Sequence, residues 1–256
     1  MATPLRVSLL ATFMVAALAI GMNAAQAAEV KVMAANAVRE AYRELVSAFE
    51  KSSGHRVDTI WGGSGGIAKR VRGGEVADIV IIAAPNIDKL ILEGKLVKGS
   101  RADFATSGVG IAVRTGLPRP DVSSAEALRK TVLAADSVAY SSGPSGTYVA
   151  DLFRKMGIAD QIRHKVRQPA SEVQIGELLA RGEADLGFQQ VSELLQVTGI
   201  VYLGPLPAEI QNITVYAAGL HAAAPAPEAA RALMKFLTAP EAGPIIRKIG
   251  MDAAGN

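Results

Sequence analysis

Short apolar runs and helix-like patterns follow one another along the chain from residue 30 onward. Between Arg39 and Lys51, the apolar residues Tyr42, Leu45 and Phe49 recur at helical spacing, and Gly54 marks the end of that helix. The β-branched run 77–84 is typical of a buried strand. The strands and helices predicted in this part of the chain are 30–34, 39–51, 56–61, 67–71 and 77–84.

A second set of alternating patterns of similar size follows residue 96. Its predicted elements are strands at 108–113, 137–140, 165–167 and 184–188 and helices at 125–134, 148–156 and 173–181. A strand at 213–217 and a helix at 227–237 come last, and they can return to the first set. Strands that alternate with helices predict an α/β fold with mainly parallel sheets, and the lack of a low-complexity linker predicts two closely joined lobes.

The first residues have the pattern of a secretory signal peptide. Arg6 precedes an apolar run from Val7 to Ile20, and Ala25-Gln-Ala27 has small residues at the positions that a signal peptidase recognises. A retained membrane anchor needs about 20 uninterrupted apolar residues, and this run is shorter. We therefore expect residues 1–27 to be removed and the mature protein to be periplasmic.

Charge and cysteine content exclude several classes of protein. Because the predicted leader contains one basic residue and no acidic one, its removal lowers the net charge from +3 to +2. Without basic blocks interleaved with aromatic residues, nucleic acid is not an expected partner. A chain without cysteine has neither disulfides nor thiolate sites, and its three histidines lack metal-ligand spacing, so we expect no metal and no cofactor.

The most informative segment is the glycine-rich turn from Gly62 to Gly66, which contains Ser64 and Gly65 and lies between a strand and a helix. Glycines let a ligand approach the backbone, and the unpaired N–H groups at a helix start favour an anion. The same residues fit a dinucleotide fingerprint, G-x-G-x-x-A, but the acidic residue expected after the next strand is absent. The turn therefore predicts an anion site.

A second turn of this kind, Gly143-Pro-Ser-Gly-Thr147, also precedes a helix. Its hydroxyl-bearing residues either cap the helix or bind a ligand, and both roles use the same free N–H groups. Ser145, Gly146 and Thr147 are the candidate ligand residues here.

Six motifs, in this order, resemble those of the molybdate-binding-protein-like periplasmic solute-binding proteins. They are Val32-Met-Ala-Ala-Asn-Ala-Val38, Gly62-Gly-Ser-Gly-Gly66, Ala77-Asp-Ile-Val80, Gly143-Pro-Ser-Gly-Thr-Tyr148, Ser171-Glu-Val173 and Ala184-Asp-Leu-Gly187. The resemblance implies the type II fold of that family: two α/β lobes, each a mainly parallel sheet flanked by helices, joined by a two-strand hinge. It implies lobe I at 28–106 and 204–256, lobe II at 107–203, and a monomer that delivers its ligand to an ABC permease.

The resemblance also implies a set of ligand positions, of which two have changed chemistry. A serine ligand of the molybdate binders aligns with Ala37, beside Asn36, and a tyrosine ligand aligns with Gln190. The positions that retain the expected groups are Ser64 with its neighbour Gly65 and the backbone N–H groups of Ser145 and Val173. A carboxamide both donates and accepts, so the change favours an organic polycarboxylate over a bare oxyanion.

Two other functions stay open at this point. Some relatives of the fold resemble aconitate isomerases, which move a proton across a tricarboxylate without a cofactor, and Glu172 or Ser64 is then the candidate catalytic residue. A receptor subunit that presents its closed complex to a membrane sensor is the other. The sequence does not distinguish solvent exposure from ligand contact for Arg39, or a helix-start role from a catalytic one for Glu172.

Overall fold

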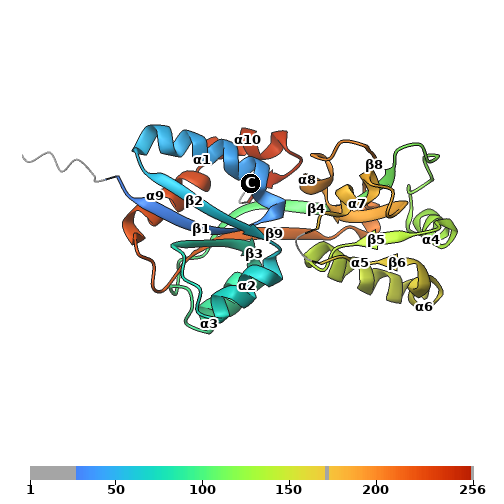
Figure 1. Ribbon diagram of the computed structural model, residues 1–256, viewed down its shortest axis with the longest axis horizontal. Helices are drawn as coiled ribbons and strands as arrows, with labels where there is room; N and C mark the ends of the chain where they lie inside the picture. The colour runs from blue at the N-terminus through green and yellow to red at the C-terminus, as the bar shows by residue number, and fades with distance from the viewer. Residues whose placement is uncertain (1–26, 171–172, 255–256) are drawn as a thin grey trace, which may run out of the picture.

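The computed structural model describes residues 27–170 and 173–254. The predicted leader, except for its last residue, and Glu172 lie outside the described residues. Two α/β lobes lie side by side along the long axis of the molecule (Figure 1), as the fold class predicted.

Lobe I contains both ends of the described chain. Its elements are β1 (Glu29–Ala35), η1 (Asn36–Val38), α1 (Arg39–Ser53), β2 (Arg56–Gly62), α2 (Ser64–Arg72), β3 (Ile79–Ala83), α3 (Ala84–Leu92), β9 (Ile213–Leu220), α9 (Pro227–Leu237), η4 (Pro240–Ala242), α10 (Gly243–Lys248) and β10 (Asp252–Ala253). Strand β4 (Ala102–Arg114) belongs to both lobes, because it pairs with β9 in the first and with β7 and β8 in the second.

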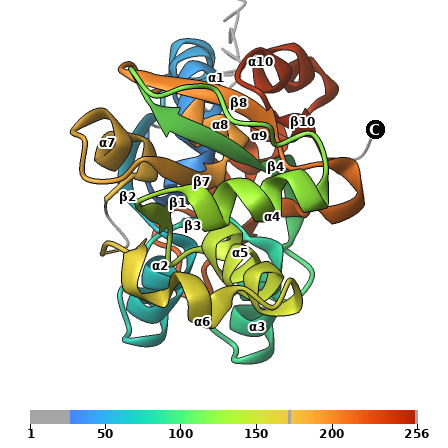
Figure 2. The ribbon, with the colours of Figure 1, turned by 90° about the vertical axis from the view of Figure 1, so that its right-hand side faces the viewer.

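Lobe II is built from the middle of the chain. Its elements are α4 (Ala125–Ala134), β5 (Val138–Tyr140), α5 (Pro144–Lys155), α6 (Ala159–Ile162), η2 (Arg163–Lys165), β6 (Val166–Arg167), α7 (Ile175–Ala180), β7 (Leu186–Gln190), α8 (Val191–Leu194), β8 (Ile200–Pro205) and η3 (Ala208–Ile210). Viewed along the long axis, α5 and α6 lie on one side of its sheet and α7 and α8 on the other (Figure 2).

The sheets combine parallel and antiparallel pairs. Strands β2, β1 and β3 are parallel to one another, as are β6, β5 and β7, and the carboxyl ends of β1, β2, β5 and β7 are followed by the segments that line the space between the lobes. Strands β4 and β9 pair antiparallel with their neighbours at the junction. Ligands of open α/β sheets bind beyond the carboxyl ends of the strands, so this topology directs several turns to one place.

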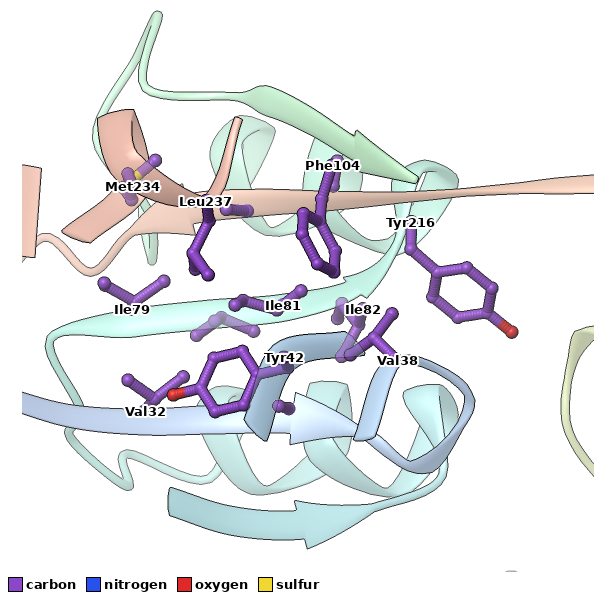
Figure 3. Close-up of a cluster of buried hydrophobic side chains, with 14 of the residues drawn as sticks. Val32, Val38, Tyr42, Ile79, Ile81, Ile82, Phe104, Tyr216, Met234 and Leu237 are labelled. Atoms are coloured by element: carbon purple, nitrogen blue, oxygen red, sulfur yellow. The ribbon is translucent and has the colours of Figure 1, made fainter. Parts of the chain in front are cut away.

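The core of lobe I explains why its helices form where the pattern predicts. Helix α1 buries Tyr42, Leu45 and Phe49 on one face, and Gly54 ends it in the left-handed conformation, with a φ of 74°. All three belong to one cluster with the β-branched residues of β3, and Figure 3 shows Tyr42 beside Ile81 and Ile82. Burying a large apolar side chain contributes about 1.5–3 kcal/mol, so this face holds the helix on the sheet.

A carboxamide links the two chain crossings between the lobes. The side chain of Gln211 accepts a hydrogen bond from the backbone N–H of Val109 (2.9 Å) and donates to the backbone oxygens of Val109 (3.1 Å) and Leu206 (3.3 Å). At Val109, the Gln211 side chain therefore supplies hydrogen bonds of the kind that the backbone of a neighbouring strand provides elsewhere in the sheet.

Several boundaries differ from the sequence prediction, which placed them from apolar spacing alone. Helix α2 begins at Ser64 instead of residue 67, and α5 begins at Pro144 instead of residue 148. The first turn of each lacks a continuous apolar stripe, because its backbone N–H groups face the space between the lobes. Strand β4 begins at Ala102 instead of 108, since its first residues alternate in burial as they leave lobe I.

Candidate functional site

A cavity of about 290 Å³ lies between the lobes. Its walls are the ends of β1 and β7, the turns and helix starts that follow strand ends, and Tyr216 of β9. The lining residues are Ala35, Asn36, Ala37, Gly63, Ser64, Gly65, Gly66, Lys69, Ser141, Ser142, Gly143, Pro144, Ser145, Val173, Gln189, Gln190, Glu193 and Tyr216. Both lobes contribute, so a molecule held here touches each of them.

Ser64 is the first residue of α2 and is buried against the end of β3. Its hydroxyl oxygen accepts a hydrogen bond from the backbone N–H of Ala83 (3.2 Å). A hydroxyl has one proton to donate, and this bond leaves that proton for a ligand. The helix N-terminus that begins beside it adds a partial positive charge.

The start of α5 provides the matching surface from lobe II. Gly143 is its N-cap and Pro144 its first residue, and the hydroxyls of Ser141 and Ser145 lie 3.2 Å apart. A Cβ atom at Gly146 would overlap the carbonyl oxygen of Ser141, so only glycine lets the turn fold back so tightly. Gly146 therefore allows the tight turn that forms this wall of the cavity, although it does not line the cavity itself.

Arg39 contacts residues of lobe I at the cavity's edge. Its guanidinium donates to the side-chain oxygen of Asn36 (2.6 Å) and lies over the ring of Trp61, 5.0 Å from the centroid. These contacts orient Asn36, which lines the cavity. Arg39 also lines a smaller cavity of about 50 Å³, which shares Asn36, Ala37 and Glu193 with the main one.

The carboxamides of Gln189 and Gln190 are bonded to protein groups. The oxygen of Gln189 accepts from the backbone N–H of Ile175 (2.8 Å), at the start of α7. The amide of Gln190 has its best partners when its nitrogen donates to the carbonyls of Ser107 (3.0 Å) and Gly108 (3.2 Å). Its oxygen then accepts from the hydroxyls of Tyr216 (3.2 Å) and Thr214 (3.0 Å). Gln190 therefore joins β7 to both junction strands.

Sequence reasoning missed Glu193 and Tyr216, which both line the cavity. Tyr216 is nearly fully buried, and its hydroxyl points away from the lobe I core (Figure 3). Burial raises the pKa of Tyr216 well above its ordinary value, and the nearby Glu193 raises it further. In the sequence, Tyr216 lies in an apolar strand, and nothing there distinguishes it from a core residue.

Glu193 is a partly buried carboxyl group just beyond the end of β7. Burial raises its pKa to about 7, although hydrogen bonds from the Gln189 side chain and the Gln190 backbone, and the positive charge of Arg39, all lower it. A position just past the carboxyl end of a strand is where α/β proteins place ligand groups, and this was the one available signal. The site thus combines helix N-termini with a carboxyl group that titrates near neutrality.

Most of the predicted ligand residues come together in this cavity. Those that line it are Asn36, Ala37, Ser64, Gly65, Ser145, Val173 and Gln190. Gly146 is buried behind the wall, and Thr147 is exposed on the next turn of α5. Lys69, Ser141 and Ser142 line the cavity without having been predicted.

Within residues 27–170 and 173–254, no group of three His, Asp or Glu side chains is arranged to hold a metal ion. In the same ranges, no helix is both long and apolar enough to cross a membrane. His221 is buried, and its ring accepts a hydrogen bond from the backbone N–H of Ala223 (3.1 Å).

Two α/β lobes that share strand β4 and enclose a cavity lined by helix starts define a two-lobe solute-binding protein. The chain belongs to the family of bacterial extracellular solute-binding proteins, whose sequence pattern matches residues 30–252. The resemblance drawn from the sequence motifs is thereby confirmed.

The relatives of this chain include an enzyme as well as transport proteins. It is 37% identical over 226 residues to an aconitate isomerase of Pseudomonas sp., with 86% of each chain covered. It is 28% identical over 244 residues to the molybdate-binding protein ModA of Azotobacter vinelandii, covering 93% of this chain and 96% of ModA.

Solved structures show the same fold. The periplasmic molybdate-binding protein of Azotobacter vinelandii superposes with a TM-score of 0.73 at 22% identity, covering 87% of this chain and 98% of that one. The sulfate-binding protein SubI of Mycobacterium tuberculosis has a TM-score of 0.73 at 18% identity, with 89% and 88% covered. At these identities, the likeness supports the two-lobe architecture and leaves the ligand open.

Proposed function

We propose that the protein binds a small polycarboxylate of the aconitate class in the cavity between its lobes. The observation that carries this proposal is the Glu193 carboxyl group in a cavity otherwise built for anions. The identity to an aconitate isomerase supports it independently.

The donors of the cavity suit carboxylate groups. The helix starts at Ser64 and Pro144 lie on opposite lobes, and the ammonium group of Lys69 is on the same wall as Ser64. Backbone N–H groups at helix N-termini bind carboxylates as readily as phosphates. A ligand with several carboxylates engages both lobes at once.

Glu193 argues against a bare oxyanion as the preferred ligand. Molybdate, tungstate and sulfate offer oxygen acceptors only, so an ionised carboxylate beside them is repulsive and unpaired. An organic acid, in contrast, presents carbon-bound hydrogens or a protonated carboxyl group to Glu193 and directs its charges elsewhere.

Isothermal titration calorimetry with a ligand panel tests the proposal. The panel contains cis-aconitate, trans-aconitate, citrate, molybdate, tungstate and sulfate, each added to the chain without residues 1–27. We expect micromolar or tighter binding of an aconitate isomer and at least tenfold weaker binding of the inorganic anions. Tight binding of molybdate or tungstate with no response to the organic acids would contradict it.

A second candidate function is the isomerisation of the bound tricarboxylate, with no cofactor. The pKa of about 7 at Glu193 favours it, because a general base works best when its pKa lies near the working pH. Incubation with cis-aconitate, followed by proton NMR for the trans isomer, distinguishes an isomerase from a binding protein.

We further propose that the mature protein is periplasmic and monomeric, and that it delivers its ligand to an ABC permease. The family, the molybdate-binding relatives and the signal-peptide pattern of residues 1–27 support this assignment. The domain division expected from the sequence, with lobe I at 28–106 and 204–256, is part of the same proposal.

A further inference from the structure

Glu193 is the residue of the cavity whose chemistry simple anion capture does not use. It lies on α8, directly after β7, and lines both the main cavity and the smaller cavity beside Arg39. A protein that only captures a bare oxyanion gains nothing from a carboxylate in this place, since it repels the ligand and costs desolvation. Its position therefore calls for another role.

The protein holds this carboxyl group in a fixed orientation. Gln189 donates to it from a side chain whose oxygen is already bonded to the N–H of Ile175, and the backbone N–H of Gln190 donates as well. Both donors belong to the end of β7 in lobe II, and they constrain the Glu193 carboxyl group where it lines the cavity. Orientation of this kind is a requirement for a base that acts on one particular hydrogen.

We propose that Glu193 removes a proton from one carbon of the bound tricarboxylate and delivers a proton to a second carbon, an inference that rests on the proposed aconitate-class ligand. The carboxylate takes a proton from the methylene carbon, that C–H bond breaks, and the electron pair spreads over the allylic carbons and their carboxylates. The carboxylic acid of Glu193 exchanges its proton with solvent and then protonates the far allylic carbon, where a C–H bond forms as the double bond moves by one position. Nothing is oxidised or reduced, and Glu193 ends ionised as it began.

The other titratable groups that line the cavity are less suitable as the base. Tyr216 keeps its proton, because burial and the charge of Glu193 both raise its pKa, and its hydroxyl is placed to donate to Gln190. Lys69 is exposed and carries a positive charge, which suits it to hold a carboxylate of the ligand. Ser64 accepts from Ala83, and its hydroxyl has no base to activate it among the described residues within hydrogen-bonding distance.

The surroundings of Glu193 also keep its charge adjustable. Arg39 lies close enough to stabilise the ionised form, whereas burial opposes it, and the balance sets a pKa of about 7. The groups that act on Glu193 from the neighbouring elements are Arg39 of α1 and the two glutamines at the end of β7. Tyr216 of β9 lines the same cavity, and its own pKa is raised by burial and by Glu193. Such a carboxyl group accepts and releases a proton readily near neutral pH.

Hydrogen exchange on the ligand tests this role separately from binding. The mature chain and its Glu193→Gln and Glu177→Gln variants are incubated with cis-aconitate in D₂O, and deuterium in the ligand is followed by NMR. Affinity is measured in parallel by calorimetry. Glu177 is the matched control, because its carboxylate lies on α7 of the same lobe, 53% exposed and outside the cavity.

We expect the wild type and Glu177→Gln to incorporate deuterium with a rate that rises through about pH 7. Glu193→Gln should bind within tenfold of the wild type and exchange at least 100-fold more slowly, in line with the usual contribution of a general base. If the wild type binds aconitate without exchange, or if Glu193→Gln exchanges within threefold of it, the proton-transfer role is overturned and the ligand assignment survives. If neither aconitate isomer binds the wild type, the ligand assignment itself is overturned.

Discussion

At the scale of single residues, the neighbours of each polar group decide what it offers to a ligand. Ser64 and Gln190 both line the cavity, yet they differ in what remains free. Ser64 accepts from Ala83 and retains its proton for a ligand, whereas both ends of the Gln190 amide are bonded to the junction strands. A sequence motif identifies such residues but does not show which of their hydrogen bonds are already made.

Replacement of Ser64 by alanine removes the ligand-facing proton and no core volume. We expect Ser64→Ala to weaken ligand binding by about 1–3 kcal/mol, which is roughly five- to 150-fold, with a nearly unchanged melting temperature. Calorimetry and thermal unfolding measure the two effects. Ser123→Ala, at an exposed serine outside the cavity, is the control. Unchanged affinity in Ser64→Ala would show that the ligand is bound elsewhere.

For the site, local sequence patterns identified residues at helix starts, and the resemblance to the molybdate binders added Val173 and Gln190. The glycine-rich turn and the hydroxyls are recognisable because the chemistry of an anion site is local in the chain. Glu193 and Tyr216 are not, since they come from a short helix and an apolar strand that only the fold brings to Ser64. Only the topology of the fold places these two side chains in the cavity.

At the scale of elements, the starts of α2 and α5 matter more than their lengths. Both helices begin several residues before their apolar pattern does, and these extra turns carry the lining residues. Sequence periodicity predicted most strands and helices because it detects the buried face. It missed the first turns because the residues there face the cavity and not the core.

Gly146 tests the shape of the α5 start. We expect Gly146→Ala to destabilise the protein by about 1–3 kcal/mol or more and to weaken ligand binding, because the added methyl group displaces the Ser141 backbone. Gly65→Ala is the control within α2, where a Cβ meets no atom within 4 Å and alanine is a better helix former. Chemical denaturation of both variants compares them, and equal stability would contradict the tight turn.

At the scale of the whole molecule, the charge of Glu193 affects the stability of the folded chain. Its pKa rises from an ordinary 4.5 to about 7, so between these pH values the folded protein keeps a proton that the unfolded chain releases. Stability contributed by this group is therefore lost as the pH rises through that window. Both lobes take part in the effect, because Arg39 of lobe I acts on a residue of lobe II.

The Glu193→Gln variant removes this titration. We expect its melting temperature, relative to that of the ligand-free wild type, to increase from about pH 4.5 to pH 7 and to level off above that range. Differential scanning calorimetry at several pH values measures the difference. Glu177→Gln should show no such trend, and a constant difference for Glu193→Gln would mean that its carboxyl group titrates at the ordinary pH.

The Gln211 carboxamide has a mechanical consequence. Where the chain passes from one lobe to the other, three hydrogen bonds to Val109 and Leu206 depend on a side chain with rotatable torsions. Those torsions can accommodate rotation of one lobe relative to the other. The hydrogen bonds between the neighbouring β-strands then need not break when the lobes rotate. The Gln211 contact is therefore a compliant connection between two more rigid β-sheets.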